Sequence, residues 1–168
     1  RDENFAMIDE ATARGIASLE ENRAAMPLDF DGDGDLDVLV VNHGGTPSLF
    51  RNDGGNYYDY IRVYVYEDSG RESIGAKVFV YRTEEDFSQT STSNDDGFGE
   101  DVLYREIGST AAFLGQGESH AHFGLGKMGT DVVFAVKVLW PPIPSFPKDT
   151  QSQIYFNVPI RSILKVRR

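Results

Sequence analysis

Nine residues in the first part of the chain, DFDGDGDLD, place an aspartate at every second position. Carboxylates this close repel one another, so the segment either stays solvated or is neutralised by a cation. Calcium takes about six to eight oxygens, and a calcium loop supplies them from side chains at positions 1, 3 and 5, a carbonyl at 7 and a later carboxylate, with glycine at 6. The expected ligands are the side chains of Asp29, Asp31, Asp33 and Asp37 and the main-chain carbonyl of Asp35, with Gly34 at the turn. The spacing therefore predicts one Ca2+ site.

The loop differs from an EF-hand after its ninth position. An EF-hand has a bidentate glutamate at position 12 and lies between two helices. Here position 12 is Val40, inside the apolar run DVLVVN, which is typical of a strand. The alternative is a solvated acidic turn between two strands.

Other groups that could do chemistry lack a complete set of partners. His120 and His122 share one face of an expected strand and could bind a transition metal, but no clear third ligand lies nearby in sequence. GQGES lacks the central serine of a nucleophile elbow, and FGLGKMG lacks the strand-to-helix context of a phosphate loop. His43 follows an expected strand and is interpreted as a loop cap. We therefore expect no enzymatic activity; a carbohydrate-active or carbohydrate-binding domain is the third interpretation.

Five tyrosines crowd one short stretch of the chain. They are Tyr57, Tyr58, Tyr60, Tyr64 and Tyr66. Tyrosine-rich faces serve protein interfaces and sugar binding, because a rigid ring gives contact area at low entropic cost. The alternative is the polar face of a sheet.

The elements that must position these residues are mostly strands. Apolar side chains alternate with polar ones in YIRVYVYE, IGAKVFVYR and DVVFAVKVLW, which is typical of strands with one buried face. The expected buried faces are Ile61, Val63 and Val65; Ala76, Val78 and Val80; and Val132, Phe134, Val136, Val138 and Trp140. Further strands are expected at AAMPLD, DVLVVN, SLFRN, VLYREI, HAHFGL, IYFNV and SILKV. The predicted fold class is all-β.

The remaining segments are expected to connect or to begin the strands. Residues 9–21 have the one helical pattern, whereas residues 82–101 and the proline-rich residues 141–153 are interpreted as exposed connections. Residues 4–9 form a strand candidate, which we expect to pair with a sheet edge of this chain or of another copy. A boundary is expected near residues 51–56.

Composition limits the partners. The 168 residues carry a net charge of −11, of which −8 lies in residues 1–55. Nucleic acid and anionic lipid would be repelled, and no apolar run is long enough to insert in a membrane. The chain has no cysteine, and it begins with Arg1, which we interpret as the start of a processed product or of a piece of a longer protein.

Several spaced motifs resemble known families. AAMPLDFDGDGDLDVLVVNHGGTPSLFRNDGGN resembles one FG-GAP or VCBS repeat, the calcium-bearing blade of β-propellers. IGAKVFV, REIGSTAAFLGQGESHAHFGLG, VKVLWPP and FNVP resemble, in order, the strands and central motif of an ASPIC/UnbV domain. The resemblance implies an FG-GAP-like repeat in residues 1–55 packed on an Ig-like β-sandwich in residues 56–168. The long segment at 82–101 and the prolines after Trp140 depart from the family pattern.

The resemblance further implies an extracellular or cell-surface, calcium-binding adhesion or structural-interaction module. Its expected partners are proteins, copies of itself and glycans. A single repeat cannot bury its apolar face alone, so this blade is expected to pack on the downstream domain, on lost upstream repeats or on another copy. The alternative function is a subunit of a homopolymeric, pilus-like filament assembled by strand addition between protomers.

Overall fold

The chain folds almost entirely into β-strands, as the sequence predicts. The computed structural model describes residues 8–91, 102–108, 116–142 and 152–168, with 47% strand and 6% helix. Strands β1 (Asn22–Leu28), β2 (Asp37–Asn42) and β3 (Ser48–Phe50) form a small antiparallel sheet. A second sheet has the order β10 (Ser162–Arg167), β4 (Asp59–Tyr66), β7 (Ala121–Gly126). A third has the order β6 (Leu103–Glu106), β5 (Lys77–Tyr81), β8 (Val132–Leu139), β9 (Ser152–Pro159).

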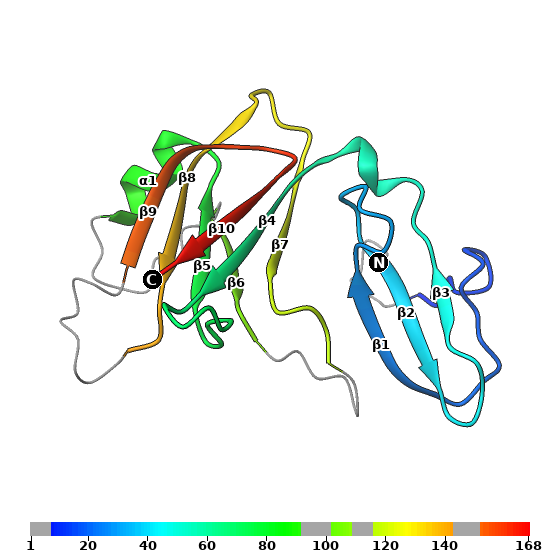
Figure 1. Ribbon diagram of the computed structural model, residues 1–168. Helices are drawn as coiled ribbons and strands as arrows, with labels where there is room; N and C mark the ends of the chain where they lie inside the picture. Colours follow the sequence, from blue (N-terminus) through cyan, green and yellow to red (C-terminus); the bar gives the residue numbers. More distant parts are fainter. Residues whose placement is uncertain (1–7, 92–101, 109–115, 143–151) are drawn as a thin grey trace.

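The second and third sheets form a sandwich, with the small sheet beside β7 and β4 (Figure 1). The core between them includes Ile61 and Val63 from β4, which are fully buried, and Val78 and Val136 from the facing sheet. Strand β4 alternates buried and half-buried residues along its whole length, so the predicted face of Ile61, Val63 and Val65 is confirmed. The face of Ala76, Val78 and Val80 is confirmed as well.

The predicted face of β8 is right at three of its five positions and wrong at Val132 and Phe134, which are half-buried. Val136, Val138 and Trp140 lie in the core as expected, and Trp140 is 3% exposed. Val133 takes the place expected for Phe134, whose ring packs instead on the outer side of the sheet. The cause is a local irregularity: the Phe134 N–H donates to the Arg82 carbonyl, and Asn157 on the neighbouring strand has a φ of +53°.

The segment predicted to be helical forms a turn, and a segment predicted to be an exposed connection contains the helix. Residues 11–15 form a turn that ends at Gly15, with a φ of +73°, and no helix follows among the described residues up to β1. Helix α1 (Glu84–Ser91) instead begins inside the segment interpreted as an exposed connection. Thr83 and Asp86 cap it reciprocally, and Phe87 packs on the outer aromatic cluster of the third sheet. Local capping and one aromatic anchor therefore outweigh the polar composition.

Some expectations fall partly outside the described residues. They include residues 4–7 of the strand candidate, residues 92–101 of the first connection and residues 143–151 of the second. Within the described parts of the chain, no helix is long and apolar enough to span a membrane.

Candidate metal centre

Three of the predicted calcium ligands converge in the loop between β1 and β2. Asp29, Asp31 and Asp37 each place one carboxylate oxygen within 4.8 Å of the others. Asp37 is 1% exposed, the Asp29 side chain is also 1% exposed, and Asp31 faces solvent. The site is therefore a cluster of hard oxygen donors, closed on one side and open on the other.

Asp33 and Asp35 direct their carboxylates elsewhere. The Oδ2 of Asp33 accepts from the Asn56 side chain at 2.9 Å, and the Oδ2 of Asp35 accepts from the main-chain N–H groups of Gly55 and Asn56 at 3.0 Å each. Burial, followed by the charge of Asp33, raises the pKa of Asp35. These side chains tie the loop to the segment that leads into β4. The predicted calcium ligand at Asp35 is its main-chain carbonyl, so the position of this side chain does not bear on that prediction.

Main-chain hydrogen bonds hold the converging carboxylates in place. Asp29 accepts from Gly32 at 2.8 Å and from Gly34 at 3.1 Å. Asp37 accepts from Phe30 and from Asn52, each at 2.8 Å. Each carboxylate therefore closes the loop on itself or onto the segment after β3.

Gly34 is required by its position. Its φ is +98°, and a Cβ there would lie 1.9 Å from the ring of Tyr60 on β4. Gly32 has a similar φ of +78°, but no atom lies within 4 Å of a Cβ built on it. Position 6 of the loop is thus constrained both by the backbone and by the sandwich behind it.

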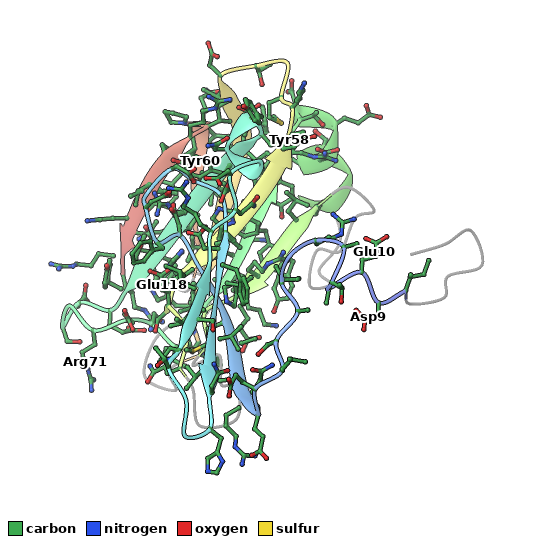
Figure 2. The ribbon with its side chains drawn as sticks, turned by 90° about the vertical axis from the view of Figure 1, so that its right-hand side faces the viewer. Asp9, Glu10, Tyr58, Tyr60, Arg71 and Glu118 are labelled. Carbon is green, nitrogen blue, oxygen red and sulfur yellow. The ribbon has the colours of Figure 1, made fainter. Side chains whose placement is uncertain are left out.

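The sandwich contributes two polar contacts to the loop. The Nη1 of Arg62 lies 2.9 Å from the Oδ2 of Asp29, and the Nε2 of His122 bonds the Gly34 carbonyl at 2.9 Å. Both residues point from the outer face of the second sheet, on strands β4 and β7. Figure 2, in which the small sheet faces the viewer, labels Tyr60 of this face. The outer face of the sandwich is therefore the wall of the site.

The donor chemistry fits calcium. All the converging groups are carboxylate oxygens, which Ca2+ prefers over the nitrogen and sulfur ligands of zinc. One further carboxylate oxygen of the loop, Oδ1 of Asp35, is buried and has no hydrogen-bond partner among the described residues. A group of this kind is costly to leave unpaired, so the loop as a whole is short of positive charge.

The two histidines do not form a metal site of their own. His122 is engaged with Gly34, and the Nδ1 of His120 lies 3.5 Å from the Oε2 of Glu118. Burial lowers the pKa of His120, which stacks on Tyr64. Among the described residues, only the aspartate cluster brings three potential ligands together. His43 lies at the end of β2 with its Nδ1 3.2 Å from Glu21.

The tyrosine cluster divides into two groups. Tyr60, Tyr64 and Tyr66 are half-buried on the outer face of β4, where the rings of Tyr60 and Tyr64 stack on His122 and His120. Tyr57 and Tyr58 are exposed. Of the first group, Tyr60 packs on Gly34 of the loop, and all three residues lie on one half-buried face of β4, as the sheet-face interpretation expects.

Sequence reasoning missed the residues outside the loop that complete the site. These are Asn52, Gly55, Asn56, Tyr60, Arg62 and His122. Asn52, Gly55 and Asn56 belong to RNDGGN, which the sequence marked only as a boundary. Arg62 carried one signal, a cation at an alternating position whose neighbours are tyrosines.

Comparison with known proteins identifies the second part of the chain. The family described as "ASPIC and UnbV" matches residues 66–168. Cartilage acidic protein 1 of Homo sapiens is 35% identical over 117 residues, and the proteins of that name from Mus musculus and Xenopus tropicalis are 34% and 33% identical. Each match covers 67% of this chain and 15% of the relative. The FG-GAP resemblance and the boundary at residue 55 stay predictions. Because the family match spans more than half of the sequence, the chain belongs to the ASPIC and UnbV family.

Proposed function

We propose that this chain is a non-enzymatic, calcium-binding interaction module of an extracellular protein. The observation that carries the proposal is the convergence of Asp29, Asp31 and Asp37 in a loop with calcium-like spacing. In this proposal Asp33 and the Asp35 carbonyl complete the ligand set after a small rotation of the Asp33 side chain. Calcium at the concentrations found outside cells saturates sites of modest affinity, which favours an extracellular location.

The relatives support the same class of function. Their name, cartilage acidic protein, refers to a tissue and to acidity, and this chain is itself acidic, with a net charge of −11. The chain spans about 15% of their length, so their full activity and partners come to it only as proposals. The ion's role here is structural: it offsets the repulsion among the loop carboxylates and stiffens the join between the small sheet and the sandwich.

Calcium titration by calorimetry tests the site. We expect one ion per chain, and we expect Asp31→Asn to weaken binding because it removes the charge of a ligand. Among the described residues, this exposed carboxylate has only long contacts, to the Asp33 N–H at 3.4 Å and to Arg51 at 4.0 Å, so the substitution disturbs little else. Asp53→Asn is the matched control, since that carboxylate is exposed and pairs with Arg51 outside the cluster. Equal binding by wild type and Asp31→Asn would place the site elsewhere.

Self-association by strand addition is a second proposal. It is favoured by β9, an edge of its sheet among the described strands, which exposes Ile154 (41%) and Phe156 (53%). Light scattering tests it with Phe156→Lys, and Leu19→Lys serves as a control because Leu19 is a fully exposed apolar residue outside the strands. Loss of assembly in the first variant alone supports the proposal. A wild-type chain that stays monomeric at millimolar concentration contradicts it.

A further inference from the structure

Arg62 is the sandwich residue that reaches the calcium loop with a full charge. Its side chain is 13% exposed, and its partner Asp29 is 1% exposed, with 2.9 Å between Nη1 and Oδ2. We propose that Arg62 is a built-in counter-cation of the loop. It holds Asp29 in the ligand position when calcium is absent, and it lowers the affinity for calcium by sharing that carboxylate. This inference rests on the calcium site proposed above.

The charge balance of the loop explains why a counter-cation is needed. Five aspartates lie within nine residues, and the described ion pairs that reach them come from Arg62 and Arg51. Arg51 is 58% exposed, lies 4.0 Å from Asp31 and is nearer to Asp53, at 2.8 Å. Solvent screens a pair of that kind almost completely. The pair of Arg62 and Asp29, with side chains 13% and 1% exposed, is therefore the one that acts on the loop in the absence of metal.

The position of Arg62 is fixed by its surroundings. Its guanidinium lies 5.5 Å from the centre of the Tyr60 ring, the ring that also packs on Gly34. Its Nε is buried and has no hydrogen-bond partner among the described residues. A largely desolvated guanidinium needs an anionic partner, so Arg62 and Asp29 hold each other in place.

The same geometry sets the response to calcium. Asp29 accepts the Gly32 and Gly34 N–H groups as well as Arg62, so the turn of the loop is organised around a carboxylate that is already paired. An ion bound by Asp29 would lie within a few ångströms of a fixed positive charge in a partly desolvated site. Repulsion of this size weakens binding by about tenfold or more.

Calcium titration of the whole chain and melting in chelator test the role of Arg62. Arg62→Gln removes the charge, so we expect the Kd for calcium to fall about tenfold and the melting temperature in chelator to fall as well. Arg62→Lys keeps the positive charge, so we expect its Kd to stay within about threefold of the wild-type value. Arg51→Gln is the matched control. It should change the Kd less than about twofold, because solvent screens the charge of this exposed side chain and little of its potential reaches the loop.

The outcomes separate this inference from the calcium site itself. If folded Arg62→Gln still binds calcium with a Kd equal to or higher than that of wild type, the counter-cation role of Arg62 is contradicted, while the calcium site itself stands. A similar fall in Kd for Arg51→Gln also overturns it, since general electrostatics would then suffice. If neither wild type nor Arg62→Gln binds calcium, the proposed function fails first. Arg62→Met replaces Arg62→Gln if the latter does not fold, with the same expected fall in Kd.

Discussion

The sandwich and the small sheet are stabilised by different means. The sandwich core is continuous and apolar, with fully buried valines contributed by both of its sheets. The small sheet buries only Ala24 and Val40 among its described apolar residues, and it exposes Val38 (40%) and Leu49 (39%). It is fixed instead by a set of carboxylates bonded to main-chain N–H groups and to Arg62. Apolar burial is therefore the main stabilising term in the sandwich, whereas the small sheet relies on polar contacts with its neighbour.

The largest expected effect lies in the sandwich. Trp140→Ala removes a ring that is 3% exposed and whose Nε1 donates to the Tyr66 carbonyl at 3.3 Å, so unfolding free energy should fall by about 3–5 kcal/mol. Urea unfolding followed by far-UV circular dichroism measures the loss. A folded variant of unchanged stability would mean that Trp140 does not anchor the core and would remove the contrast with the small sheet.

Calcium removal should act on the other region. We expect a chelator to lower the stability of the small sheet, by about 2.7 kcal/mol if calcium is otherwise present at about a hundred times its Kd. The fluorescence of Trp140, the single tryptophan, reports on the sandwich alone, while limited proteolysis between β1 and β3 reports on the small sheet. Equal protection with and without chelator would count against a structural ion.

The contact between the two regions can be tested at position 34. Gly34→Ala combines a φ of +98° with a clash against Tyr60, whereas Gly32→Ala has a φ of +78° and open space. The backbone cost, about 1–2 kcal/mol, is shared by both variants, so the extra loss in Gly34→Ala measures the contact with the sandwich. Thermal melts of the two variants give the difference. Equal losses would show that the loop does not pack on Tyr60 in solution.

The smallest effect concerns Asp59, a carboxylate of the sandwich that accepts from a main-chain N–H group as the loop carboxylates do. The Met128 N–H, at 2.7 Å, and then Arg161, at 2.9 Å, hold the pKa of Asp59 below its usual value. A lowered folded-state pKa stabilises the protein above the unfolded-state pKa of about 4, and this contribution is lost as the pH falls through the folded-state value. Asp59→Asn should therefore be less stable than wild type at about pH 7, and the difference should shrink as the pH falls below about 4. A pH-independent difference between the two melting temperatures would contradict this.

Local patterns in the sequence determined most of the strands and the spacing of the loop aspartates. Alternation of apolar residues is a property of a few consecutive positions, so the faces of β4 and β5 were predictable. Phe134 and α1 were not, because a local irregularity of β8 and an aromatic contact between α1 and the third sheet decide them. The sequence likewise shows the spacing of the aspartates but not which of their carboxylates converge in the folded loop.

Only the tertiary structure decided what surrounds the loop. Arg62 meets Asp29, and His122 meets Gly34 across 88 residues, because β4 and β7 pair in the sheet whose outer face the loop packs against. No local pattern encodes such contacts, since they depend on how two separately formed sheets pack. The sequence by itself determined that this protein is an all-β chain with a calcium-like acidic loop, and the fold determined that a half-buried arginine from the sandwich faces that loop.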